Sequence, residues 1–211
     1  MFKILIGDIM RPHRFNFNKY RKEYDSYSFK QLQEIYNELE LLYPKQEHFT
    51  TEYIERFLTN IPSPKIMELG GFKGELASQI LAKNKRILLW HNYDICPNSI
   101  EKTMCKDKRY KAILLEDFAW NLDIFDSYNV CILSHTIEHI KQKQLKRFFD
   151  KIKNVKYIYI EAPMRLSWNN TPTTHILECG WKAITNMLRD YKEIIKRKHL
   201  RKVAGIRVYV K

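Results

Sequence analysis

Glycine is scarce in this chain of 211 residues: there are six glycines, and three of them, Gly70, Gly71 and Gly74, fall within five residues. Long apolar runs are absent as well. No segment approaches the roughly 20 residues needed to span a bilayer, and Met1–Ile9 is too short for a signal peptide and has no cleavage site. The sequence therefore predicts a soluble, cytoplasmic protein.

Cysteine pairs are also missing. The four cysteines form no C-x-x-C motif, and each lies in a segment with the pattern of a strand or a helix: Cys96, Cys105, Cys131 and Cys179. This spacing argues against both a disulfide framework and a cysteine zinc site. We expect reduced thiols.

Acidic residues are outnumbered, 24 against 37 basic ones, which gives a net charge of +13. Residues 11–30 carry +4 and residues 192–211 carry +7, so two windows hold most of the excess. The first window interleaves its basic residues with aromatic ones, a pattern suited to phosphates and stacked bases. The alternative is a compositional bias, because lysine is abundant along the whole chain.

The composition, 45% hydrophobic and 13% aromatic, excludes a disordered chain. Apolar residues recur at helical spacing over 29–43 and 53–58, and two prolines interrupt the chain at Ile61–Pro64. We therefore expect a helical N-terminal region, 1–62, and a second unit, 63–211.

Beyond residue 63, strand and helix patterns alternate. Strand patterns cover 65–69, 86–93, 111–115, 129–134 and 157–161, and helical periodicity covers 74–82, 97–105, 143–152 and 181–191. Residues 193–197 and 205–210 follow as two strands able to form an antiparallel hairpin. This alternation predicts an α/β fold with a mostly parallel sheet covered on both faces.

The segment Ile66–Ala77 is a strand that ends in an acid, then a glycine turn, then a helix. Ligands of open parallel sheets bind at such carboxyl ends, where glycines let the backbone approach closely. The segment lacks both the P-loop and the G-x-G-x-x-G signatures. Glu68 would repel a phosphate but would pair with a cation such as the amino group of a methionine moiety.

The next two strands also end in acids. Asp94 stands where a carboxylate accepts ribose hydroxyl protons, 26 residues after Glu68. Glu116–Phe118 follows the third strand, where Asp117 is suited to an adenine amino group and Phe118 to flanking the ring. The fourth strand leads into Ser134–His139, with the pattern S-H-x-x-E-H.

With these motifs and Glu161–Pro163, residues 64–211 resemble the class I S-adenosylmethionine-dependent methyltransferases. The resemblance implies a Rossmann-like, doubly wound sheet of seven strands, a C-terminal hairpin and an N-terminal helical cap. The family's glycine motif usually reads acid-x-G-x-G-x-G, whereas here Phe72 replaces the middle glycine and Gly71 stands one place earlier.

The resemblance also implies roles for individual residues in binding S-adenosylmethionine. The turn Gly70, Gly71 and Gly74 would bend around the methionine moiety. Ser134 and His135 would line the reactive side of the cofactor. The remaining cofactor-binding residues are those at the ends of the first three strands: Glu68, Asp94, Ile95, Glu116, Asp117 and Phe118.

The H-x-x-E-H run at His135 is also the inverted signature of zinc proteases. It follows a strand directly instead of lying within a long helix, which argues against such a protease. A divalent cation held by His135, Glu138 and His139 is the alternative to our preferred interpretation, a site without metal in which His139 orients the turn.

Methyl transfer to a hydroxyl needs a base, and imidazole has a suitable pKa. His175, in the loop after the fifth strand, is the first candidate and His135 the second, although His175 fits equally well as a cap of the next helix. The polar and aromatic run Trp168–Thr174 suits a small sugar-like acceptor. We therefore expect a sugar O-methyltransferase. The alternatives are an RNA methyltransferase that uses the two basic windows and a non-catalytic cofactor-binding scaffold.

Overall fold

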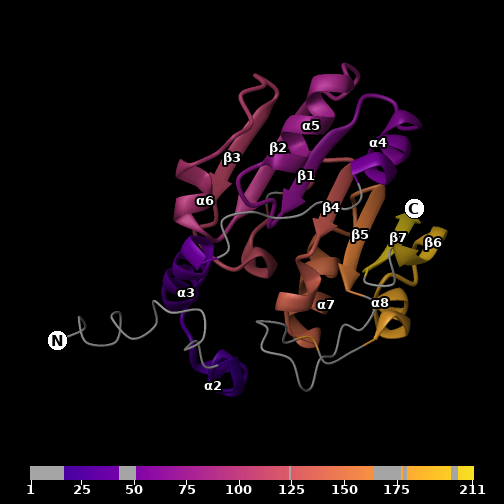
Figure 1. Ribbon diagram of the computed structural model, residues 1–211. Helices are drawn as coiled ribbons and strands as arrows, with labels where there is room; N and C mark the ends of the chain where they lie inside the picture. Colours follow the sequence, from indigo (N-terminus) through magenta and orange to yellow (C-terminus); the bar gives the residue numbers. More distant parts are fainter. Residues whose placement is uncertain (1–16, 43–50, 124, 164–176, 178–179, 201–203) are drawn as a thin grey trace.

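A single seven-stranded sheet organises the protein. The computed structural model describes residues 17–42, 51–123, 125–163, 177, 180–200 and 204–211. The strand order is β3-β2-β1-β4-β5-β7-β6 (Figure 1). The strands are β1 Lys65–Leu69, β2 Leu89–Asp94, β3 Tyr110–Leu114, β4 Val130–Ser134, β5 Tyr157–Pro163, β6 Lys192–Leu200 and β7 Ala204–Val210.

Strands β1 to β5 are parallel, and β7 runs antiparallel to both β5 and β6. The winding of the sheet reverses between β1 and β4, which makes their carboxyl ends the switch point where open α/β sheets bind ligands. The predicted doubly wound sheet with a C-terminal antiparallel hairpin is confirmed.

Helices cover both faces of the sheet (Figure 1). Helices α4 (Thr51–Thr59) and α5 (Glu75–Lys83) pack on one face, and α7 (Gln142–Lys151) and α8 (Trp181–Met187) pack on the other. Because neighbouring strand residues point to opposite faces, Ile66 joins the first core and Met67 the second. Burial on both faces explains why the strands are almost continuously apolar.

The N-terminal region occupies two places. Helix α2 (Phe17–Glu23), the 3-10 turn η1 (Tyr24–Ser26) and helix α3 (Phe29–Leu42) lie toward the carboxyl ends of the parallel strands (Figure 1), whereas α4 packs against α5 on the sheet. Of the described elements in the expected cap region, 1–62, α2, η1 and α3 therefore lie over this edge and α4 does not; we call α2, η1 and α3 the cap. Our prediction did not include α2, because its seven residues FNKYRKE carry few apolar side chains to reveal a period.

Most element boundaries fall within a few residues of their predicted positions. The exceptions are the predicted helices 181–191 and 97–105: α8 ends at Met187, and α6 is Pro97–Glu101 only. The chain leaves the helix because the N–H of Met104 donates to the carbonyl of Lys73, 2.8 Å away, which draws the segment toward the glycine turn. Two further 3-10 turns, η2 (Ala119–Asn121) and η3 (Ile137–His139), follow β3 and β4.

Three cysteines, Cys96, Cys105 and Cys131, are buried free thiols. Cys179 lies outside the described residues. None of the helices that the structure describes has the length and apolarity to cross a membrane.

Candidate functional site

The turns that follow β1, β2, β3 and β4 lie at one edge of the sheet, because the carboxyl ends of parallel strands share an edge. These turns and the last residues of the strands before them hold every predicted cofactor-binding residue. The first candidate base, His175, and the predicted acceptor loop Trp168–Thr174 lie outside the residues that the structure describes.

The glycine turn after β1 is tight. Gly70 and Gly74 have φ angles of 74° and 76°. A Cβ on Gly71 would lie only 2.4 Å from Cδ of Glu68 and 2.7 Å from Oδ1 of Asn92. Phe72 also has a positive φ, 51°, which residues other than glycine rarely adopt. Phe72 thus has a left-handed backbone conformation at a position where the predicted resemblance expects a glycine, at a cost in backbone strain.

Two side chains of β2 hold this turn in place. Oδ1 of Asn92 accepts the N–H of Gly71 at 2.9 Å, and its amide donates to the carbonyl of Phe72 at 2.9 Å. Oδ2 of Asp94 accepts the N–H of Phe72 at 2.9 Å, while Oδ1 accepts the N–H of Cys96 at 2.8 Å. Sequence reasoning missed Asn92, although its position two residues before Asp94 places both side chains on the same side of the strand.

Each carboxylate oxygen of Asp94 can accept a further hydrogen bond, because a bond from one N–H occupies only one of its two lone pairs. Burial raises the pKa of Asp94 to about 6, although the N–H groups of Cys96, Phe72 and Ile95 act in the opposite direction. The site therefore holds a carboxyl group that changes its charge just below neutral pH.

Glu68 lies beneath the turn and has no exposed surface. Its Oε2 accepts the indole N–H of Trp90 at 2.8 Å, and its Oε1 has no hydrogen-bond partner among the described residues. Burial raises the pKa of Glu68 to about 8, against the effect of the Trp90 bond and with a further contribution from Asp94. The Glu68 side chain thus contacts the underside of the turn, next to Gly71.

The turn after β3 is closed by its own side chains. Asp117 accepts the N–H of Phe118 at 2.7 Å and the amide of Asn121 at 3.0 Å. The Phe118 ring stacks on Trp120, with centroids 4.6 Å apart. Glu116 is exposed, whereas Ile95 and Phe118 are partly buried against the cap residues Tyr20, Tyr24 and Leu32.

A second group of charged side chains lies after β4. The two nitrogens of His135 face two carboxylates: Nδ1 is 3.4 Å from Oε1 of Glu138, and Nε2 is 3.5 Å from Oε1 of Glu161. We call these three residues the His135 cluster. Ser134 pairs with Glu161 in the β4–β5 register, so the sheet brings Glu161 beside His135, which lies 26 positions earlier in the chain.

In the His135 cluster, the carboxylates favour the charged form of the histidine, and the histidine favours the charged form of Glu138. Burial disfavours the imidazolium form, but Glu138 and Glu161 outweigh it and raise the pKa of His135 to about 10. Burial likewise acts to raise the pKa of Glu138, but His135 and His139 hold it below its usual range. His135 has a φ of 52°, so this cluster, like the glycine turn, contains a strained residue.

Thr136 connects the glycine turn after β1 with the His135 cluster after β4. Its hydroxyl donates to the carbonyl of Leu69, 2.6 Å away, and a Cβ on Gly70 would lie 2.9 Å from that hydroxyl oxygen. No cluster of three or more His, Cys, Asp or Glu side chains with the spacing of a metal site is found within the described part of the chain.

No family model matches the sequence, and no curated protein matches it either. Many solved structures are similar in fold. Magnesium protoporphyrin IX methyltransferase (ChlM) from Synechocystis PCC 6803, with bound S-adenosylhomocysteine, is 12% identical with a TM-score of 0.60, covering 99% of each chain. The methyltransferase domain of bacterial CtHen1-C is 14% identical with a TM-score of 0.60, covering 76% of this chain and 95% of that one. The chain has the Rossmann-like methyltransferase fold.

A third similar structure, the small RNA methyltransferase HEN1, is 13% identical with a TM-score of 0.60 and covers 79% of this chain and 26% of that one. The acceptors named for these structures differ in chemical class. The comparison therefore gives the fold and leaves the reaction to be argued from the site.

In this methyltransferase fold, the cap helix α3 contacts each of the first three turns. Glu40, which is buried, pairs with Lys73 of the glycine turn at 2.5 Å and with Lys102 at 3.3 Å. Oδ1 of Asn37 accepts the N–H of Asn98 at 2.8 Å. Near the other end of α3, Gln33 donates to the carbonyl of Leu115 at 3.1 Å. Sequence reasoning missed these residues, because their role depends on packing between distant segments.

Proposed function

We propose that this protein is an S-adenosylmethionine-dependent methyltransferase. The main observation behind the proposal is the hydrogen bond by which the glycine turn and Asp94 hold each other in place: the N–H of Phe72 donates to Asp94. Both lie near the switch point of the sheet. Structures with the same fold contain the cofactor or its product: ChlM with bound S-adenosylmethionine and NodS with S-adenosylhomocysteine.

The chemistry of the donor set fits this cofactor. Because Gly70 and Gly71 have no Cβ, the turn packs directly on Thr136, Glu68 and Asn92 and keeps the bent conformation that would curve around a methionine moiety. Asp94 is placed to accept from ribose hydroxyls, and Asp117, Ile95 and Phe118 are suited to the adenine. We assign Glu68 the task of supporting the turn from below, since its side chain has no exposed surface. We assign Ser134 and His135 to the reactive end of the cofactor, and we include Gly74 and Glu116 in the proposed cofactor-binding set.

The bound cofactor supplies an electrophilic methyl group, so the protein has to position an acceptor and take up its proton. A histidine with a pKa of about 10 is already protonated at neutral pH and accepts no proton. We therefore assign His135 to holding Glu138 and Glu161, and the base to His175. The substitution His175→Ala should leave cofactor affinity unchanged and lower turnover at least about a hundredfold; unchanged turnover would exclude this role.

The acceptor is a small hydroxyl-bearing molecule in our first hypothesis, which depends on the loop Trp168–Thr174. The second candidate is RNA. It is favoured by the net charge of +13 and by the small RNA methyltransferase HEN1 among the similar structures. Salt separates the two, because RNA binding weakens steeply as ionic strength rises, whereas binding of a neutral sugar does not.

Isothermal titration calorimetry of the purified protein with S-adenosylmethionine and S-adenosylhomocysteine tests the proposal. We expect saturable binding of both. Absence of a binding heat at several temperatures would overturn it. Transfer of a radiolabelled methyl group to small RNA or to a metabolite extract then identifies the acceptor class. Binding without transfer to either would favour the third hypothesis, a non-catalytic scaffold.

A further inference from the structure

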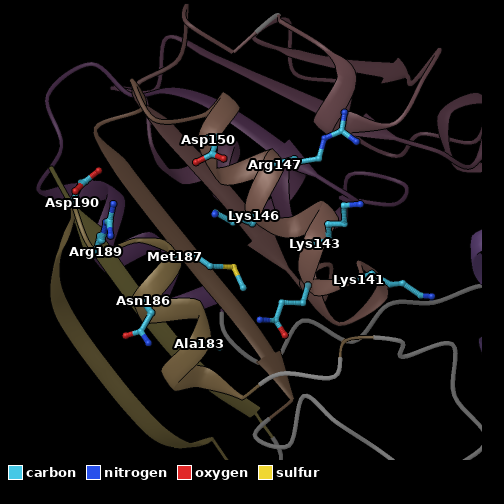
Figure 2. A pocket seen from close by; sticks show the side chains of 11 residues that line it. Lys141, Lys143, Lys146, Arg147, Asp150, Ala183, Asn186, Met187, Arg189 and Asp190 are labelled. Carbon is cyan, nitrogen blue, oxygen red and sulfur yellow. The ribbon is translucent and has the colours of Figure 1, made fainter.

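A groove lies between helices α7 and α8, on the sheet face opposite α4 and α5 (Figure 2). It encloses about 870 Å³. Ala183 and Met187 of α8 line its apolar part, and both pack at the border of the core. Helix α7 has ten residues, so the groove follows it for about 15 Å. None of the residues assigned to the cofactor lines this groove.

The groove is basic at one end. Lys141, Lys143, Lys146 and Arg147 line it from the start and middle of α7. Its two acids, Asp150 and Asp190, lie with Arg189 toward the other end (Figure 2). A ligand with several negative charges therefore fits best along the first two turns of α7.

Few of these charges are neutralised by the protein. Lys141 pairs with Asp25 of the cap at 2.5 Å. Among the residues that the structure describes, Lys143, Lys146 and Arg189 take part in no ion pair. Like charges three and four residues apart on a helix repel one another, so an anion placed between them would relieve that repulsion.

The basic end begins beside the candidate site. Lys141 follows His139 by two residues, and its Nζ lies 5.6 Å from the centroid of the Tyr24 ring in the cap. A chain-like ligand in the groove would thus extend to the edge where β4 ends and the His135 cluster lies.

The lining favours a polymer held through its backbone. The cations are spread along the helix instead of converging on one point, which suits a series of phosphates better than a single one. No aromatic side chain is among the described residues that line the groove, so these residues offer no surface for stacking bases.

We propose that the groove between α7 and α8 binds the phosphate backbone of a single-stranded RNA and leads the strand toward the carboxyl edge of the sheet. The purpose of this binding, presenting an acceptor, rests on the proposed methyltransferase function, but the binding itself does not. The groove is separate from the two basic windows that the sequence singles out.

Fluorescence anisotropy with a labelled single-stranded 20-nucleotide RNA, without cofactor, tests the proposal. The variant Lys143→Glu/Lys146→Glu/Arg147→Glu should raise Kd at least about tenfold at low salt. It should also reduce the slope of log K against log salt by about 2, since each lost phosphate contact of a single strand contributes about 0.7.

The matched control is Lys106→Glu/Lys108→Glu/Lys111→Glu, which changes the net charge equally at three exposed lysines next to and within β3, on the far edge of the sheet. We expect its Kd to change by less than about threefold. Equal losses in both variants would overturn the proposal, because net charge alone would then explain the binding. Competition by polyglutamate as strong as that by unlabelled RNA would also overturn it, in favour of an acidic protein partner.

Thermal unfolding followed by circular dichroism checks that both variants keep their fold, and calorimetry with S-adenosylhomocysteine measures cofactor binding separately. If the unmodified protein binds RNA through the groove but binds no cofactor, the proposed function fails and the groove proposal stands. If it binds cofactor and the groove variant binds RNA normally, the groove proposal alone fails.

Discussion

The two halves of the carboxyl edge stabilise their acids in different ways. At the ends of β1 and β2, the carboxylate of Asp94 is held by backbone N–H groups of the glycine turn and of Cys96. At the ends of β4 and β5, Glu138 and Glu161 face a histidine side chain. Backbone donors carry no net charge, whereas a protonated imidazole does.

This difference appears in the acid–base properties of the two halves. At Asp94, only backbone N–H groups counteract the effect of burial on the pKa. Burial is the larger effect, and the pKa of Asp94 rises to about 6. A neighbouring cation outweighs burial at Glu138, whose pKa is lowered. The first half thus gains negative charge as the pH rises toward neutral, and the second keeps its ion pairs, so the two are separable by mutation and by pH.

The largest effect should come from Asp94→Ala. It removes the carboxylate proposed to accept the ribose hydroxyls and leaves the N–H groups of Phe72 and Cys96 without their partner. We expect cofactor affinity to fall about a hundredfold, which corresponds to about 2.7 kcal/mol. Calorimetry measures this change.

The control for Asp94→Ala is Asp123→Ala, which removes an exposed aspartate paired with Lys151. A surface ion pair of this kind contributes about 0–1 kcal/mol to stability, and cofactor affinity should stay unchanged. Equal affinities in Asp94→Ala and the control would exclude Asp94 from the cofactor site.

The substitution Gly71→Ala tests the packing of the first half. Its Cβ would meet Glu68 and Asn92 at distances shorter than any normal contact, so the turn has to shift. We expect a loss of about 1–3 kcal/mol in the free energy of unfolding. Gly180→Ala is the matched control, since no heavy atom of the described chain lies within 4 Å of its added Cβ. Similar denaturation midpoints for the two variants would contradict the geometry of the turn.

The first half of the edge was predictable from the sequence because its elements are local. A strand, an acid and a glycine turn are neighbours in the chain, and parallel strands place successive acids at one edge. Glu68 shows the limit of this reasoning. Its position at the strand end was read correctly, but only packing against Trp90 reveals that the carboxyl group lies beneath the turn.

The second half was less predictable, because it is assembled across the sheet. Glu161 comes beside His135 only through the β4–β5 register, and no sequence spacing indicates that pairing. The contacts of Glu40 and Asn37 with the turns are hidden for the same reason, since helix periodicity says which face is apolar but not which turn it covers.

The pH dependence of cofactor binding should follow Asp94. The carboxyl group has a pKa of about 6, and the ionised form is the better acceptor for hydroxyl protons. At pH 5, about a tenth of it is ionised, so we expect affinity about tenfold weaker than at pH 8. The variant Asp94→Asn should bind weakly and with little pH dependence over this range. The same slope in both proteins would assign the pH dependence to another group.

The last prediction concerns the effect of His135 on stability. A histidine whose pKa is raised to about 10 by folding contributes stability that is present below about pH 6.5 and is lost as the pH rises through 10. The variant His135→Asn removes this titration, and asparagine tolerates the positive φ of 52°. We expect the Tm of the natural protein to fall between pH 7 and pH 10 by several degrees more than that of the variant, because the linked loss is about 3 kcal/mol and each 1 kcal/mol lowers the Tm of a chain of this length by about 2–4 °C. Because imidazolium is the form that both carboxylates stabilise, parallel pH profiles would mean that His135 is neutral in the folded protein, and the base would then have to be sought at His135 as well as at His175.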